Sequence, residues 1–348
     1  MAKSKSERDI GIDFLKAIAI FGVIVIHTCS EGYTNPILSF NWLSSVFWGS
    51  IVRASVPIFF MCSGALLLTP EKELPLKRLY TKNLLKIVLS LFIWALGYKA
   101  LHIIAAGTYS LRDILQAFKE VLLFKLEYHL FFLQIMVVVY VFLPVTRVFT
   151  KHATKKELEY ALAIWFLLGI VYPTVKPFWP FSLLGGIPVQ WMINMTYAAI
   201  GYGLSGYYLS KYLISLKLSI LSLAAGFLGV YGATILMSVQ TQTLYQHFLE
   251  GMSVFVALLA IGIFGLCFNL KDSIGGKAAA VIRKLSKASF CVYLVHVFWI
   301  YLFNFLGISV NAFPCLLSIP LVSCLNLALS YCTYLILSKI PLVRSWLV

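Results

Sequence analysis

Long apolar runs alternate with short polar segments along the whole chain, and ten of these runs have the length of membrane helices. A helix needs about 20 apolar residues to cross the hydrocarbon core of a bilayer, and an open strand edge leaves its backbone unsatisfied there. The pattern therefore predicts a single all-α domain over 1–348, a polytopic membrane bundle. The predicted helices cover 10–29, 48–69, 84–105, 129–149, 159–175, 191–209, 217–237, 250–268, 287–306 and 313–337.

Two segments between these runs have patterns of their own. In 110–127, Ser110 and Asp113 have the spacing of a capping box, and apolar residues then recur at helical intervals. This pattern predicts an amphipathic helix lying on the extracytoplasmic interface of the bilayer. The segment 173–190 is rich in Pro, Gly and aromatic residues, which favours an ordered lid or a re-entrant loop.

The composition agrees with the apolar pattern and bounds the class of protein. Hydrophobic residues make up 61% of the chain and charged residues 12%, whereas a soluble domain carries roughly 25% charged residues. A chain this apolar cannot cover its surface with polar groups, so the lipid bilayer is its expected solvent. The net charge is +15, but the basic residues lie in short loops. Their positions indicate topology and contacts with anionic lipid, and no nucleic acid partner is expected.

The distribution of Lys and Arg between the loops predicts the orientation. With the N-terminus inside, the six inner segments carry 20 basic residues and the outer loops carry four. That asymmetry fits the positive-inside rule, and ten helices then place both termini in the cytoplasm. The first apolar run lacks a small-residue cleavage site, so we expect a retained helix. The chain is predicted to be a multi-pass protein of a plasma membrane.

Three ionisable residues lie on the first predicted helix, where each is costly and therefore informative: Asp13, Lys16 and His27. His27 falls about 20° past three full turns from Lys16, and Asp13 falls about 40° to the other side, so all three share one stripe. Lys16 and His27 are about 16 Å apart along the axis. A cation at the inner end suits an anionic ligand, and an imidazole at the outer end can take a proton from a hydroxyl. Alternatively, the stripe faces the bundle interior and Asp13 pairs with Lys16.

Arg53 lies several residues inside the second apolar run and needs a partner or a water-filled cavity. Its side chain could bind an anionic substrate group, stabilise an oxyanion, or extend to the outer interface. Glu250 lies at the predicted outer start of the eighth helix. We expect it to interact with that helix dipole, although it could instead orient a catalytic imidazole.

Two more histidines are candidates for chemistry. His129 is predicted at the outer end of the fourth helix, at a depth similar to that of His27, where an aromatic belt is the alternative. His296 is predicted near the middle of the ninth helix. It is either a packing histidine or part of the wall of a channel for the donor substrate.

Several chemistries have no support in the sequence. No P-loop, GxGxxG, HExxH or GxSxG motif is present, so nucleotide-driven transport, dinucleotide redox chemistry and zinc proteolysis are not indicated. The seven cysteines include no CxxC pair and lie mostly in apolar runs, where they act as small hydrophobic residues. We expect no metal site.

Together these patterns resemble the acyltransferase 3 family of membrane acyltransferases over nearly the whole chain. Four motifs carry the resemblance, each on the expected helix and in the expected order. They are Asp13 and Lys16 followed by His27, the stretch Arg53–Gly64, the stretch Tyr128–Gln134 with Tyr140 and Pro144, and the stretch Tyr293–His296. Phe131 stands where the family usually has Trp. Within the family, the chain looks most like enzymes that O-acetylate polysaccharides such as enterobacterial common antigen.

The resemblance implies a cytoplasmic acetyl-CoA donor and an extracytoplasmic carbohydrate acceptor, at the inner membrane of a bacterium. It also implies that His27 is the essential catalytic residue and that Lys16 stands where a cation is needed at the donor end. One departure concerns the start of the third helix, where the family often has an Arg-x-x-Arg pair. Here the stretch 82–86 reads KNLLK, so a nucleotide contact rests on Lys82, Lys86 or Arg78.

The resulting hypothesis is a membrane O-acetyltransferase. His27, with His129 and Arg53, acts on a hydroxyl of a surface polysaccharide or lipid-linked glycan. The donor side is assigned to Asp13, Lys16, Arg78, Lys82, Lys86 and His296. The alternative is an exporter of a sugar or a lipid-linked glycan, which ten helices with buried charges would also suit.

Overall fold

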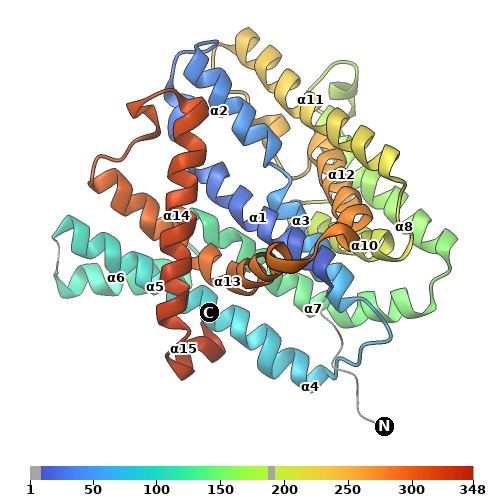
Figure 1. Cartoon of the computed structure of the whole chain (residues 1–348), viewed down its shortest axis with the longest axis horizontal. Coiled ribbons are helices and arrows are strands. Elements are labelled where there is room, and N and C mark those ends of the chain that lie inside the picture. Colours follow the sequence, from blue (N-terminus) through green and yellow to red (C-terminus); the bar gives the residue numbers. More distant parts are fainter. Residues whose placement is uncertain (1–8, 108, 187–192, 348) are drawn as a thin grey trace.

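The structure, a computed structural model, describes residues 9–107, 109–186 and 193–347, and in these residues every regular element is helical. The all-α prediction is confirmed. The α-helices are α1 Ile10–Thr28, α2 Phe40–Ile51, α3 Ser55–Leu67, α4 Leu76–Arg78, α5 Leu85–Ala106, α6 Leu111–Leu122, α7 Phe131–His152, α8 Lys155–Phe166, α9 Tyr172–Val175, α10 Met195–Lys211, α11 Leu216–Thr241, α12 Val254–Leu270, α13 Gly276–Phe305, α14 Cys315–Leu337 and α15 Pro341–Trp346. Figure 1 shows α1 in the middle of the bundle, where it packs against α3, α13 and α14.

Across the described part of the chain, nine helical segments are long and apolar enough to cross a membrane, whereas ten were predicted. The difference is the predicted span 191–209, of which 191 and 192 lie outside the described residues. Its place is taken by α10, whose 17 residues rise only about 26 Å. This helix is short because it packs inside the bundle, where protein rather than lipid surrounds most of its surface.

The contact between α10 and α3 brings two backbones together. A Cβ added to Gly64 would lie 1.8 Å from the carbonyl oxygen of Gly203. A Cβ added to Gly206 would lie 2.1 Å from the carbonyl oxygen of Met61. Any side chain at either glycine would therefore force the helices apart, as expected for small residues at membrane helix contacts.

The predicted continuous helix 48–69 is wrong. The chain forms α2 and α3 with a break over 52–54, and α2 begins eight residues before the predicted start. Pro57 favours the break, because its ring clashes with the carbonyl group four residues earlier, at Arg53, and proline fits best in the first turn of a helix, where Pro57 lies in α3. The hydrophobic pattern continues across this break, so it does not reveal it. The break places Arg53 at a junction between two helices.

At the predicted inner side, two helical segments begin before the apolar runs that predicted them. α13 begins at Gly276, eleven residues before the predicted start, because its first turns are polar and extend beyond the apolar part. Consequently Lys287 lies on a helix rather than at a loop end. α5 follows one stretch of π-helix, η2 (Leu79–Leu84). Such stretches occur frequently at functional sites.

The two segments with special patterns each contain helix among their described residues. Ser110 caps α6 by accepting a hydrogen bond from the backbone N–H of Asp113, 3.2 Å away, which confirms the predicted amphipathic helix. The exposed apolar side chains of this helix include Leu115 and Phe118. The predicted lid 173–190 contains the end of α9 and the short helix Phe181–Gly186, and its residues 187–190 lie outside the described part.

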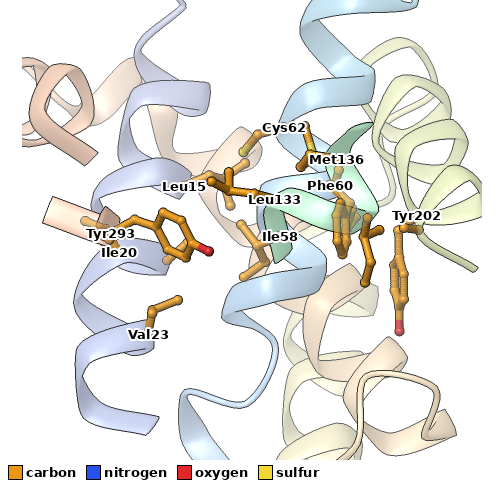
Figure 2. Packing of buried hydrophobic residues seen from close by; sticks show 14 of the residues in the cluster. Leu15, Ile20, Val23, Ile58, Phe60, Cys62, Leu133, Met136, Tyr202 and Tyr293 are labelled. Carbon is orange, nitrogen blue, oxygen red and sulfur yellow. The ribbon is translucent and has the colours of Figure 1, made fainter. Parts of the chain in front are cut away.

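The largest apolar cluster joins α1, α3, α7 and α13. Figure 2 shows Tyr293 of α13 among residues of this cluster, with Leu15 and Ile20 of α1 and Ile58 of α3 nearby. Tyr293 is only 6% exposed. Its phenol is a polar group inside an otherwise apolar core, and it lies at the edge of the candidate site.

Candidate active site

Three histidines from distant parts of the chain meet in what we call the histidine cluster: His27, His129 and His296. His27 is in the last turn of α1, His129 is in the short helix η3 (Tyr128–Leu130), and His296 is in α13. The ring of His296 lies 5.3 Å from the ring of His27 and 5.3 Å from that of His129, measured between centroids. His129 and His296 are buried, whereas His27 is partly exposed.

Backbone contacts fix the tautomer of His296. Its Nδ1 lies 2.7 Å from the carbonyl oxygen of Tyr293, and a carbonyl oxygen only accepts, so Nδ1 carries the hydrogen. The remaining nitrogen, Nε2, then presents a lone pair and has no hydrogen-bond partner among the described residues. The backbone carbonyl of His296 accepts a hydrogen bond of 3.0 Å from the Asn326 side chain of α14. The Tyr293 carbonyl therefore orients the ring, and Asn326 ties the backbone of His296 to α14.

His129 is surrounded by aromatic rings. Its ring packs edge-on against Tyr98 of α5, with centroids 5.0 Å apart, and against Tyr293, with centroids 5.7 Å apart. The Tyr293 hydroxyl donates a hydrogen bond of 2.6 Å to the backbone carbonyl of His129. Within the described residues, neither ring nitrogen of His129 has a hydrogen-bond partner. Across all the residues that the structure describes, no group of three His, Cys, Asp or Glu side chains is placed to hold one metal ion.

A cavity of about 450 Å³, which we call the lysine cavity, adjoins the cluster through Tyr293, which lines it and whose ring packs against those of His129 and His296. Four ammonium-bearing side chains line it, together with Asn83. They are Lys16, Lys82, Lys86 and Lys287. The rest of the wall is largely apolar or aromatic, and includes Phe59, Phe132, Met136 and Tyr293. Four cations on an apolar slot suit a long ligand that carries several negative charges at one end.

The predicted donor-side residues differ in how they relate to this cavity. Lys16, Lys82 and Lys86 line it, whereas Arg78 is exposed on α4 and is not one of its lining residues. Asp13 is 1% exposed and accepts a hydrogen bond of 2.6 Å from the Ser286 hydroxyl of α13. This contact joins α1 to α13 one turn before Lys16.

Two residues of the lysine cavity were not predicted. Lys287 was the first residue of the predicted helix 287–306 and was given no role; because α13 begins eleven residues earlier, Lys287 lies well inside this helix and on the cavity wall. Ser345 belongs to α15, which is tied to α5 by two hydrogen bonds. Ser90 donates to the carbonyl of Trp346 over 3.1 Å, and the Trp94 indole donates to that of Leu347 over 3.2 Å. Figure 1 shows α15 beside α5. No local pattern in the sequence indicates these long-range contacts.

Two further cavities meet at His27. The larger, of about 410 Å³, is called the arginine cavity and is lined by Arg53, Glu250 and mainly apolar groups. The smaller, of about 170 Å³, is lined by Glu31 and Asn304 among others. His27 lines both. One imidazole therefore faces two spaces that lie away from the four lysines.

The arginine cavity settles how two predicted residues lie. Arg53 is half-buried and its Nε donates to the carbonyl of Leu249, so its side chain is engaged in the bundle. The expected position of Glu250 at the start of a helix is wrong, because α12 begins only at Val254, with Ser253 at its N-cap position. Glu250 instead lies in the turn after η7 (Gln246–Leu249) and faces the cavity that contains His27.

The cavities separate the segments that were predicted on opposite sides of the membrane. Lys82 and Lys287, from predicted inner segments, meet in the lysine cavity. Glu31 and Glu250, from predicted outer segments, line the cavities at His27. α1 links the two sides, since Lys16 and His27 are about 16 Å apart along its axis. The arrangement can bind a charged ligand at one end and activate a hydroxyl at the other.

Comparison with known proteins agrees with this geometry. A family model described as an acyltransferase domain matches residues 9–335, which is nearly the whole chain. No curated protein and no solved structure gives a match. The matched region contains the histidine cluster and the three predicted lysines of the lysine cavity. The chain is a multi-pass membrane acyltransferase and belongs to the acyltransferase 3 family.

Proposed function

We propose that this acyltransferase moves an acetyl group from cytoplasmic acetyl-CoA to a hydroxyl of an extracytoplasmic carbohydrate, at the inner membrane of a bacterium. The observation that carries the proposal is the position of His27. This imidazole lines two cavities that contain no lysine, while a separate cavity lined by four lysines includes Tyr293, which packs against His129 and His296.

The lysine cavity supports the choice of donor. Coenzyme A combines phosphates at one end with a long, mostly uncharged arm that ends in the thioester. Its phosphates would bind Lys16, Lys82, Lys86 and Lys287. Its arm would lie along Phe132 and Tyr293, which line the same cavity and lead toward His129. Ammonium groups are common phosphate ligands in proteins.

The chemistry assigned to His27 is general-base catalysis. Its imidazole takes the proton of the acceptor hydroxyl while the hydroxyl oxygen attacks the acyl carbon. The C–S bond then breaks, the thiolate takes the proton back from the imidazolium, and the products are an ester and free coenzyme A. Arg53 in the arginine cavity would bind the acceptor or polarise the carbonyl.

The acceptor is assigned to the cavities that face away from the lysines. They contain one arginine, two glutamates and an asparagine, which suits hydrogen bonding to sugar hydroxyls better than binding a polyphosphate. We propose a surface polysaccharide or a lipid-linked glycan. Apolar residues on the wall of the arginine cavity, such as Phe131 and Met195, would accommodate the lipid-linked form.

The test uses purified protein in sealed vesicles, with acetyl-CoA labelled on the acetyl group and supplied on one side only. Wild-type protein is expected to label a glycan on the opposite side. His27→Ala should lose about 10²–10⁴-fold in kcat, the usual contribution of a general base. His152→Ala is the matched control, because His152 is an exposed histidine at the end of α7.

Two outcomes would contradict the proposal. Full activity in His27→Ala would remove the catalytic assignment. Movement of glycan across the membrane with no label on it would support the alternative, an exporter, although membership in an acyltransferase family favours transfer.

A further inference from the structure

His129 poses a problem that the proposed chemistry leaves unsolved. Its side chain is 1% exposed, yet neither ring nitrogen has a hydrogen-bond partner among the described residues. An imidazole carries at least one N–H in every protonation state found in proteins. A buried donor without a partner costs about 1–3 kcal/mol. A hydrogen-bond acceptor on the bound substrate would account for a buried His129 N–H that has no partner in the described part of the protein.

The position of His129 indicates which substrate group that is. The residues around it divide between the cavities: Phe132 lines the lysine cavity, Phe131 lines the arginine cavity, and the Tyr128 ring lies 5.0 Å from that of His27. Tyr293, on the wall of the lysine cavity, donates to the backbone carbonyl of His129. A thioester that extends from the lysine cavity toward His27 therefore passes the ring of His129.

The other two histidines are less suited to donate a hydrogen bond there. The Nδ1 hydrogen of His296 is already held by the Tyr293 carbonyl, so its free nitrogen only accepts. The nitrogen of His27 that faces the acceptor must itself accept a proton if it acts as the base. Of the histidine cluster, His129 is the buried member with no ring nitrogen in a hydrogen bond of standard geometry within the described residues, and its chain neighbours Phe131 and Phe132 line the two cavities.

We propose that His129 donates a hydrogen bond to the carbonyl oxygen of the acyl thioester during transfer. This inference rests on the proposed function. As the acceptor oxygen bonds to the acyl carbon, the carbonyl π electrons move to its oxygen, and the His129 N–H stabilises the negative charge. When the C–S bond breaks, those electrons return to the carbonyl and the thiolate takes the proton held by His27. His129 keeps its own proton throughout.

The test compares His129→Ala with His129→Gln, in which a side-chain amide again offers an N–H. His129→Ala should lower kcat about 10²–10³-fold, as loss of one oxyanion donor does, with little change in the KM for the donor. His129→Gln should recover part of that loss. His102→Ala is the matched control, because His102 is a nearby histidine with a half-exposed side chain that pairs with Glu127. Thermal unfolding of each purified variant reports whether it is folded.

Two measurements distinguish a hydrogen-bond donor at His129 from a residue that only supports the fold and from a general base. The pH profile of kcat/KM should keep its shape in His129→Gln, because His27 remains the base. The infrared carbonyl stretch of bound acetyl-CoA, labelled with ¹³C at the carbonyl, should lie at lower frequency in wild type than in His129→Ala. Loss of a limb of the pH profile, or an unchanged stretch with unchanged kcat, would overturn the inference. Failure of wild-type protein to bind acetyl-CoA would instead contradict the proposed function.

Discussion

The lysine cavity and the arginine cavity have similar sizes, about 450 and 410 Å³, but they are built differently. The lysine cavity is lined by four cations and no carboxylate. The arginine cavity is lined by one cation, Arg53, and one carboxylate, Glu250. A wall of one charge selects a ligand by its net charge. A wall of mixed charge selects by hydrogen bonding and shape. Under the proposed function, this difference means that the lysine cavity would select the donor mainly by its phosphates and the arginine cavity would select the acceptor by its local structure.

The two cavities also differ in how the chain forms them. Every lysine of the lysine cavity lies on a helix, and the π-helical stretch η2 carries one of them. The arginine cavity takes Arg53 from a break between two helices and Glu250 from a turn. Turns and helix junctions tolerate sequence change better than helix faces. We therefore expect the acceptor side to adapt to new ligands more readily than the donor side.

The largest expected effect comes from the cations of the lysine cavity. Lys16→Ala and Lys287→Ala should each raise the KM for acetyl-CoA about 10–100-fold, because a hydrogen bond to a charged group contributes about 1.5–3 kcal/mol. The KM for the acceptor should stay the same. Steady-state kinetics with each substrate varied in turn measures both values.

The matched control for these variants is Lys284→Ala. Lys284 is exposed on α13, three residues before Lys287, and is not among the residues that line the cavity. An equal rise in KM for Lys284→Ala would mean that the effect comes from general surface charge and not from the cavity.

The lysine cavity shows how far the sequence alone predicts this protein. The apolar runs predicted the all-α bundle, and the stripe on the first helix together with the family resemblance led to Lys16 and His27. Lys287 was missed because hydropathy measures only the apolar part of a helix, and α13 extends beyond it. The break at Arg53 was missed because its cause is the steric effect of Pro57, not polarity.

The contacts among the histidines were beyond the sequence for a different reason. His27, His129 and His296 lie on three elements far apart in the chain, and helical periodicity reports only neighbours within one helix. The apolar runs predicted similar depths for His27 and His129 but a mid-bilayer position for His296, so they did not predict that the three rings touch, which depends on how the helices pack.

A smaller effect is expected at Arg53 in the arginine cavity. Arg53→Lys keeps the charge but loses the planar donor set, and should raise the KM for the acceptor about tenfold while the KM for acetyl-CoA stays unchanged. Arg147→Lys is a suitable control, since Arg147 also donates to backbone carbonyls, those of Leu67 and Lys72, and lies outside the cavity. A change in the donor KM alone would assign Arg53 to donor binding and contradict the assignment of the arginine cavity to the acceptor.

The α15 wall of the lysine cavity should respond more weakly. Ser90→Ala and Trp94→Phe each remove one hydrogen bond to the backbone of this segment. A hydrogen bond contributes about 1 kcal/mol, so each variant should raise the donor KM about fivefold. Trp299→Phe is the control, because it removes an indole hydrogen bond to Thr333 elsewhere in the bundle. An unchanged donor KM in both variants would show that α15 does not shape the donor site.

The smallest effect is expected far from both cavities, at the ion pair that ties α6 to α5. The Lys99 ammonium hydrogen-bonded to Glu120, with 2.5 Å between the charged atoms, lowers the pKa of the Glu120 carboxyl. A carboxyl whose pKa is lower in the folded protein than in the unfolded chain stabilises the fold at pH values above its unfolded pKa. That stabilisation is lost as the pH falls through the folded value.

Because the pair is partly exposed, it should contribute less than about 1 kcal/mol. Glu120→Gln should therefore lower the melting temperature slightly at pH 7, and that difference should vanish at a pH well below the lowered folded pKa, where the wild-type carboxyl is protonated. Thermal unfolding in detergent at both values measures this difference, and Lys99→Met provides the double-mutant cycle. Unaltered donor and acceptor KM values would show that α6 affects stability separately from both cavities. A changed acceptor KM would instead show that α6 influences the arginine cavity.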